Sequence, residues 1–332
     1  MRVLALLLVT AVSTVAHAQP NIGPAEPAAA TRPVAAPYSS GQPGAAPPVA
    51  SGTTASAPAG AAPVGQDEPG LSAADAFEAG RIALMNKDYA SALLWLRDAA
   101  GQDSADAQAL LGTLYETGLG VARDDAQAYR LYSRAAEQQH PDGMARLGLM
   151  YANGRAVERD DEQALSLFLE AAGNGSAVGQ NGLGLMYLDG AAVEQNDAEA
   201  LKWFREAAGQ GDPSGENNLA MMFRDGRGVE RDDAEAARWY RTAANQGYAE
   251  AQANLGLMYS LGRGAARDDA EAVKWFRKAA EQGHALAQYY MGISCAEGRG
   301  MPKNPAEAAD WLGKAANQGL AVARTYLARL QD

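Results

Sequence analysis

The chain has 332 residues and a formal net charge of −12 at pH 7, with 40 acidic against 28 basic side chains. This acidic balance repels nucleic acid and anionic membrane surfaces, so we predict that neither is a partner. Cys295 is the only cysteine, which excludes an intramolecular disulfide and a metal centre built from several cysteines.

The first 18 residues have the pattern of a secretory signal peptide. Arg2 precedes an apolar run at 3–15, and Ala16-His17-Ala18 then places small residues around a histidine. We predict cleavage after Ala18 and a mature chain that is periplasmic or secreted. The alternative, an uncleaved membrane anchor, needs a longer apolar span of about 20 residues. No second run of that length follows, so we predict no membrane insertion of the mature chain.

Residues 19–70 have a different composition from the remainder of the chain. This segment holds 11 of the 15 prolines, mixed with alanine, glycine and serine. Such a segment buries too little apolar surface to offset the entropy lost on ordering. We therefore predict a disordered linker that tethers the folded part, residues 71–332.

The folded part is built from an internal repeat of 36 residues. An Ala-Ala pair recurs at that spacing, at 99–100, 135–136, 171–172, 207–208, 243–244, 279–280 and 315–316. A loop glycine recurs with it, at Gly118, Gly154, Gly190, Gly226, Gly262 and Gly298. A feature that recurs at a fixed spacing belongs to the architecture of a repeat protein rather than to an active site.

Each repeat is predicted to contain two helices. In "AEAQANLGLMYSLG" and "DAEAVKWFRKAAEQG" the apolar residues recur every three or four positions, as on one face of a helix. Between two such helices, Asp232 stands three residues before Glu235, which is the spacing of a capping box. Gly226 and Gly228 are expected to end the preceding helix with positive φ. The loop acids are thus interpreted as helix caps, and we predict no metal or phosphate site there.

The stretch "LGLMYSLGRGAARDDAEAVKWFRKAAEQGHALAQ" closely resembles the consensus of the Sel1-like repeat (SLR) family, which is related to the tetratricopeptide repeat. The resemblance covers six units over 105–320. Residues 71–104 look like an ordinary tetratricopeptide hairpin, and 321–332 like a terminal capping helix. The resemblance implies an all-α fold, a right-handed α-solenoid whose first helices line the concave face. Family members are mostly adaptors for protein complexes, and many are exported in bacteria.

The residues that most suggest chemistry have structural interpretations. Cys295 occupies a position that is Tyr or Phe in the other units, so we interpret it as a core residue. His140 and His284 fall at the turn between repeats and are interpreted as exposed turn residues. The five tryptophans share one position of the second helix and are interpreted as packing residues. Neither a G-x-S-x-G nor an S-x-x-K motif occurs, so we predict no catalytic residues.

Positions that vary between repeats are free to specify a ligand, because the constant ones hold the fold. On the presumed concave face, asparagine side chains are suited to bond the backbone of an extended peptide, and tyrosines to anchor a partner. The candidate partner-binding residues are Asn181, Asn217, Asn218, Arg224, Asn254, Tyr289 and Tyr290. A solvated polar groove without a ligand, or aromatic contacts that close the C-terminal end, is the alternative.

The sequence therefore predicts an exported, non-enzymatic adaptor that binds a protein or peptide partner, with no cofactor and no metal. By family analogy, the settings are envelope signalling, secretion or polysaccharide-export assembly. One alternative is a hydrolase of β-lactam or cell-wall substrates. It is disfavoured because the family branch associated with β-lactamase activity has a disulfide in each repeat. A glycan-binding module is the other alternative. The sequence leaves the oligomeric state open.

Overall fold

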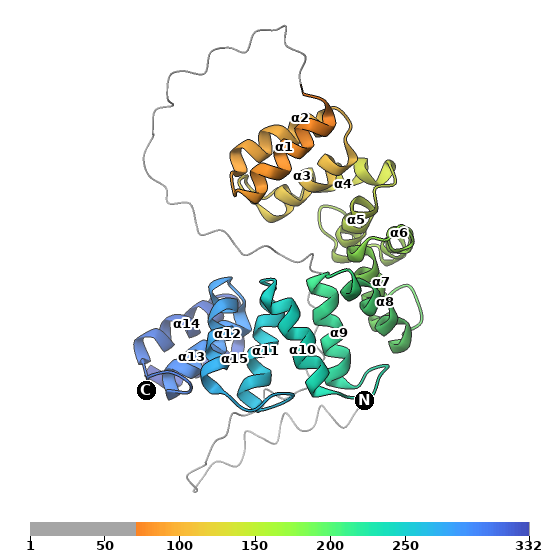
Figure 1. Cartoon of the computed structure of the whole chain (residues 1–332). Coiled ribbons are helices and arrows are strands. Elements are labelled where there is room, and N and C mark those ends of the chain that lie inside the picture. Colours follow the sequence, from red (N-terminus) through yellow and green to blue (C-terminus); the bar gives the residue numbers. More distant parts are fainter. Residues whose placement is uncertain (1–70, 332) are drawn as a thin grey trace, which may run out of the picture. The chain divides into compact units, whose positions relative to one another are not determined.

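The computed structural model describes residues 71–331, which form fifteen α-helices and no strand (Figure 1). The signal peptide predicted for 1–18 and the linker predicted for 19–70 lie outside the described residues. The helices are α1 (Ala73–Met85), α2 (Tyr89–Gly101), α3 (Ala105–Thr117), α4 (Asp125–Glu137), α5 (Pro141–Asn153), α6 (Asp161–Gly173), α7 (Ala177–Asp189), α8 (Asp197–Gly209), α9 (Pro213–Asp225), α10 (Asp233–Asn245), α11 (Ala249–Leu261), α12 (Asp269–Glu281), α13 (Ala285–Glu297), α14 (Pro305–Asn317) and α15 (Ala321–Gln331).

Each helix packs against the next one along the chain, so that the helices form a series of hairpins. Six hairpins, from α3–α4 to α13–α14, correspond to the six predicted repeats. The hairpin α1–α2 precedes them and α15 follows them. This arrangement confirms the predicted all-α solenoid. Among the helices of residues 71–331, none combines the length and the apolar character needed to cross a bilayer.

The second helix of each hairpin begins at an aspartate or asparagine cap. In α10 the carboxylate of Asp232 accepts hydrogen bonds from the backbone N–H groups of Ala234 and Glu235, both at 2.9 Å. The predicted reciprocal half of the capping box is wrong. The backbone N–H of Asp232 instead donates to the carbonyl oxygen of Phe223 at 2.9 Å. Because that donor is already satisfied, the Glu235 carboxylate pairs with Arg238.

The loop glycines adopt the left-handed conformation that the sequence predicts. Gly226 has φ 68° and ends α9, its backbone N–H bonding to the carbonyl oxygen of Met222. Gly228 follows with φ 66°. One unit later, a Cβ on Gly264 would lie 1.9 Å from the backbone oxygen of Asp233. The loop passes so close to the start of α10, the second helix of the preceding repeat, that a side chain has no room.

Two units carry alanine where Gly228 and Gly264 stand in theirs. Ala156 has φ 59° and Ala192 has φ 55°, both in the left-handed region. A side chain in that conformation brings Cβ too close to the neighbouring carbonyl oxygen, at a cost of roughly 1–2 kcal/mol per residue. These two loops are therefore strained relative to their glycine counterparts.

The core of each hairpin is formed where a large side chain of the second helix, an aromatic ring or a leucine, packs on a small residue of the first. At Gly184 an added Cβ would lie 2.6 Å from the ring of Phe204, which is fully buried. Gly215 approaches Ala207 equally closely at the contact with the preceding second helix. The recurring glycines and the Ala-Ala pairs thus set how closely neighbouring helices approach.

Two kinds of side-chain contact span 30 residues; the first lies within one repeat and the second joins successive repeats. In the first, a glutamine at the end of a second helix donates to a buried residue of the first helix. The pairs are Gln138–Gln108, Gln210–Gln180, Gln246–Glu216, Gln282–Gln252 and Gln318–Gln288. In the second, a loop arginine pairs with an aspartate of the preceding second helix. The pairs are Arg155–Asp125, Arg227–Asp197 and Arg263–Asp233.

Candidate binding surface on the first helices

Four predicted asparagines lie together on three successive first helices, where they form a chain of hydrogen bonds. Asn218 of α9 donates to Asn181 of α7 at 2.8 Å. Asn254 of α11 donates to Asn217 at 3.0 Å, and Asn217 donates to its neighbour Asn218 at 3.4 Å. We call this set of four residues the asparagine ladder. It runs from α11 through α9 to α7, across two junctions between repeats.

The ladder is partly covered by the fold. Asn181 and Asn217 are 5% and 6% exposed, and Asn218 and Asn254 are half-buried. Because a buried amide without a partner costs free energy, these bonds contribute to the fold as well as arranging the surface. Within the described residues, the ladder leaves the amide nitrogen of Asn181 and the carbonyl oxygen of Asn254 unused. It therefore presents a donor at one end and an acceptor at the other.

Arg224 lies in the last turn of α9, seven residues after Asn217, and its guanidinium is already engaged. It makes two hydrogen bonds to the carboxylate of Asp225, at 2.7 and 2.8 Å, and is 23% exposed. Burial lowers the pKa of Arg224, yet the bonds to Asp225 and the nearby charges outweigh burial and raise it. A ligand would have to share or displace Asp225 to bind this arginine.

The two predicted tyrosine anchors join the packing at the C-terminal end. Tyr290 stacks on Phe276 with 4.9 Å between ring centroids, and Tyr289 lies 5.5 Å from Tyr290. Tyr289 also packs against the buried cluster around Leu312. The hydroxyl of Tyr290 is buried without a partner within the described residues, and burial raises the pKa of Tyr290 to about 12. This placement favours the alternative in which the tyrosines close the C-terminal end.

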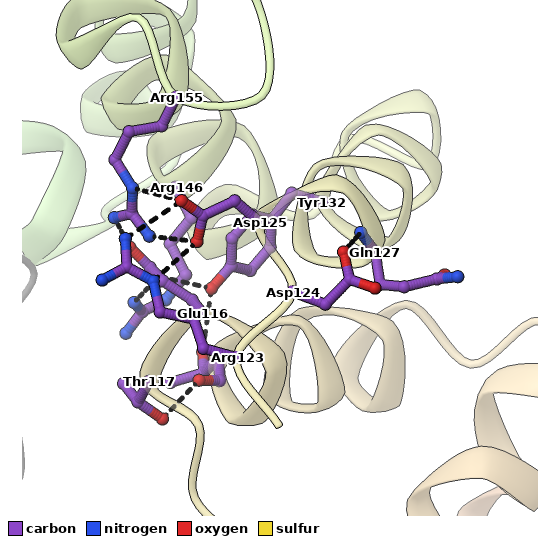
Figure 2. Close-up of polar contacts among 10 residues, drawn as sticks. Glu116, Thr117, Arg123, Asp124, Asp125, Gln127, Tyr132, Arg146 and Arg155 are labelled. Atoms are coloured by element: carbon purple, nitrogen blue, oxygen red, sulfur yellow. Dashed lines mark hydrogen bonds and ion pairs between the residues drawn. The ribbon is translucent and has the colours of Figure 1, made fainter. Parts of the chain in front are cut away.

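The structure adds a buried charged cluster that the sequence analysis did not select. Figure 2 shows it between α3, α4 and α5. Glu116, 5% exposed, accepts hydrogen bonds from the hydroxyl of Tyr132 at 2.7 Å and from Arg155 at 2.6 Å. Arg146 approaches the same carboxylate at 3.4 Å. Burial raises the pKa of the Tyr132 hydroxyl, so it remains a donor to Glu116 at neutral pH.

A second carboxylate extends this cluster towards the loop before α4. Asp125 accepts two bonds from Arg123 at 3.0 Å and another from Arg155 at 2.7 Å (Figure 2). The two arginines hold the pKa of Asp125 well below its usual range. Arg155 therefore bridges two carboxylates, one on each helix of the preceding hairpin. The cluster ties the first two repeats together.

The sequence did carry a signal for this cluster. Glu116 occupies a repeat position that elsewhere holds Ala152, Leu188, Arg224, Ser260 and Ala296. The two charged members, Glu116 and Arg224, are the ones whose hairpin has a buried tyrosine, Tyr132 or Tyr240, where the others have phenylalanine or leucine. A charged residue at this position of the first helix thus occurs together with a tyrosine in the second helix of the same hairpin. Reading that repeat position across all units would have found the cluster.

The remaining chemically suggestive residues have structural roles. Cys295 is fully buried, and burial raises the pKa of its thiol to about 11, which disfavours the nucleophilic thiolate. The interpretation of His140 and His284 as exposed turn residues is wrong. Each caps a first helix through Nδ1, and each pairs through Nε2 with an acid of the preceding first helix, Asp106 or Glu250. The tryptophans are buried or half-buried against neighbouring helices.

The Sel1 repeat family model matches the chain six times, at residues 105–140, 141–176, 177–212, 213–248, 249–284 and 285–320. These are the boundaries of the six hairpins with the turns that follow them. No curated protein matches the chain.

Two solved structures show the likeness in three dimensions. One is a protective antigen present in uropathogenic Escherichia coli strains, displaying an SLR fold. It is 35% identical with a TM-score of 0.53, and the match covers 78% of this chain and 56% of that one. The other is a Sel1 repeat protein from Oxalobacter formigenes. It is 29% identical with a TM-score of 0.57, and the match covers 73% and 96%. This chain thus spans little more than half of the E. coli antigen.

Proposed function

The chain belongs to the Sel1 repeat family, and we propose that it is a non-enzymatic scaffold that binds a protein or peptide partner on its first helices. The observation that carries this proposal is the asparagine ladder. The half-buried members of this amide chain, Asn218 and Asn254, can offer both donors and acceptors, as the backbone of an extended peptide requires. The Sel1 repeat fold is itself compatible with an adaptor for protein–protein interaction.

We place the ligand at the ladder rather than at the tyrosines. The ladder lies on half-buried positions of α9 and α11, where a partner can reach Asn218 and Asn254. Tyr290 is already stacked on Phe276, so a partner would find less of its surface available. Arg224 is a secondary candidate, because its pairing with Asp225 has to be exchanged for a ligand carboxylate.

The proposal includes export of the mature chain to the periplasm or the medium, on the strength of the N-terminal sequence pattern. Envelope signalling, secretion and polysaccharide-export assembly remain the proposed settings, by family analogy. A β-lactam or cell-wall hydrolase gains no support from the side chains of the first helices. Their one thiol, Cys295, is buried with a raised pKa, and burial of the nucleophile opposes catalysis. No observation favours a glycan-binding module.

The test is affinity capture from envelope extracts with the mature chain, residues 19–332. The wild type is compared with Asn218→Leu plus Asn254→Leu, which removes the accessible amides. The matched control is Lys202→Ala on α8, an exposed second-helix residue. A partner captured by wild type and control but lost from the asparagine variant supports the ladder. Equal capture by all three proteins contradicts the placement of the site.

A further inference from the structure

One buried position of the first helix is glutamine in four of the six repeats, methionine (Met144) in the repeat of α5 and glutamate in the repeat of α9. Glutamine stands there as Gln108, Gln180, Gln252 and Gln288, and each is at most 7% exposed. In the repeat of α9 the residue is Glu216, which is 2% exposed. A buried carboxyl group is costly when ionised, so its surroundings decide which form it takes.

Gln252 and Gln288 use both a donor and an acceptor at this position. The amide nitrogen of Gln252 donates to the carbonyl oxygen of Ala244 at 3.1 Å, and that of Gln288 to Ala280 at 3.2 Å. The amide oxygen of Gln252 accepts from Gln282 at 2.8 Å. Gln252 and Gln288 thus link the second helix that precedes them to the turn that follows their own hairpin, whereas Gln180, among residues 71–331, makes only the bond to the turn.

Glu216 reproduces the acceptor half of this arrangement. One of its carboxyl oxygens accepts from the amide nitrogen of Gln246 at 2.9 Å, as Gln252 accepts from Gln282. The carbonyl group that corresponds to Ala244 is that of Ala208, at the end of α8. Next to Glu216, a Cβ on Gly215 would lie 3.1 Å from the backbone nitrogen of Ala208, so the two helix ends are in close contact.

An ionised carboxylate has only acceptors, whereas a protonated carboxyl group has a donor as well. We propose that Glu216 is a proton-binding residue that makes the α8–α9 junction depend on pH. With its proton, the carboxyl group donates to the carbonyl oxygen of Ala208, as Gln252 and Gln288 donate to the equivalent carbonyl oxygens. Without the proton, the carboxylate oxygen and the carbonyl oxygen face each other and the junction weakens.

The charges around Glu216 act in the same direction. Burial raises the pKa of Glu216 to about 7, the bond from the neutral Gln246 of α10 opposes the rise, and the nearby charge of Asp212 adds to it. Asp212 caps α9, and burial raises its own pKa to about 6; Arg146 of α5 opposes this rise and Asp142 adds to it. The contacts that its neighbours on α9 make with α8 and α7 are uncharged: Gly215 lies against Ala207, and Asn218 bonds to Asn181.

The sign of the effect follows from linkage. The ordinary pKa of 4.5 describes Glu216 in the opened junction, and a pKa of about 7 describes it in the closed one. The proton's contribution is therefore complete below pH 4.5 and is lost as the pH rises to about 7. The opening equilibrium should increase by up to about tenfold per pH unit across that window and then level off.

The inference does not require the proposed function, although α9 also carries Asn217 and Asn218 of the ladder. Native-state hydrogen exchange on the mature chain, corrected for the intrinsic exchange rate, measures opening of α8 and α9. For wild type we expect at least a tenfold greater opening equilibrium at pH 8 than at pH 5, and for Glu216→Gln a nearly constant one. The infrared band of a protonated carboxyl should be present in wild type at pH 6 and weaker in Glu216→Gln.

Two further variants make the test decisive. Gln252→Glu in the Glu216→Gln background should move the pH response to the α10–α11 junction. Asp212→Asn, which keeps the helix cap, should retain the response at α8–α9. The proposal is overturned if wild type and Glu216→Gln respond alike, if the response disappears only with Asp212→Asn, or if Glu216→Gln fails to fold. That last result would refute the equivalence with the other repeats.

Discussion

The hydroxyl group of Tyr132 donates a 2.7 Å hydrogen bond to the buried carboxylate of Glu116, whereas the hydroxyl of Tyr240 is buried without a partner within the described residues. The two tyrosines occupy the same position of the second helix, two of whose other occupants are Phe168 and Phe204. One repeat thus matches its tyrosine with an acceptor and the other places Arg224, a donor, at the equivalent position.

This pair gives a direct test of what the Glu116 bond contributes. Tyr132→Phe removes a hydrogen bond to a charged group and should lower the free energy of unfolding by about 1.5–3 kcal/mol. Tyr240→Phe removes an unpaired buried hydroxyl and should be neutral or stabilising. Urea unfolding of both variants measures the difference. Equal losses in the two would contradict a specific role for Glu116.

Replacing the two alanines that have positive φ, Ala156 and Ala192, by glycine should stabilise the chain. Ala156→Gly and Ala192→Gly should each raise the free energy of unfolding by about 0.5–1 kcal/mol, the strain relieved being partly offset by the greater freedom of glycine when unfolded. The control is Ala152→Gly inside α5, which should destabilise by about 1 kcal/mol. Thermal unfolding measures all three. A loss of stability in both loop variants would show that these loops are unstrained.

One junction lacks the arginine–aspartate contact that joins other repeats. Ala191 occupies the position of Arg155, Arg227 and Arg263, so among residues 71–331 Asp161 pairs only with Arg159 of its own loop. Ala191→Arg should add an ion pair with Asp161 and stabilise the chain by about 0.2–1 kcal/mol at low salt. The gain should shrink at high ionic strength and vanish when Asp161→Asn is added. A gain that survives both changes would have another origin.

The ladder and the tyrosines should differ in how they affect partner binding. Asn217→Ala with Asn218→Ala should weaken binding of the captured partner about tenfold, equivalent to about 1.4 kcal/mol, because two of the four ladder amides are removed. Tyr290→Phe should leave affinity unchanged, since the hydroxyl it removes is buried. Titration calorimetry measures both, and circular dichroism checks that the helices persist. The reverse order of effects would move the site to the C-terminal end.

Acid should weaken the repeat junctions through the paired aspartates. The bonds from Arg231 and Arg263 lower the pKa of Asp233 to about 2, from 3.8 when unfolded. Its contribution is therefore present above pH 3.8 and is lost as the pH falls to about 2. Asp233→Asn should be less stable than wild type at pH 6, and the difference should narrow at pH 2. A difference that does not change with pH would mean that the ion pairs contribute nothing.

The regular parts of the fold could be predicted because they recur. A 36-residue period placed every hairpin, and glycine and aspartate in fixed positions placed the loops and caps. The capping box was mispredicted because the sequence does not show that the Phe223 carbonyl reaches the backbone N–H of Asp232. Side-chain hydrogen bonds and ion pairs across the junctions could not be predicted either, because they depend on how the hairpins stack.

The candidate site was only partly predictable for the same reason. Periodicity placed the four asparagines on one helix face, but the bonds that join Asn181 to Asn218 and Asn217 to Asn254 required the structure. Tyr290 was selected for its residue type, and its packing on Phe276 changes its interpretation. Glu216 was not selected from the sequence, because its burial and the bond from Gln246 depend on how the helices pack.

The contacts between repeats have a constant reach, and this makes the chain modular in length. Excision of the unit 249–284 would bring Arg299 opposite Asp233 in place of Arg263, and Gln288 opposite Ala244 in place of Gln252. The same kinds of junction would form again. The ladder, however, would end at Asn217, with Tyr290 where Asn254 had been. Gain or loss of whole units can thus reshape the surface offered to a partner while the means of holding the units together stays the same.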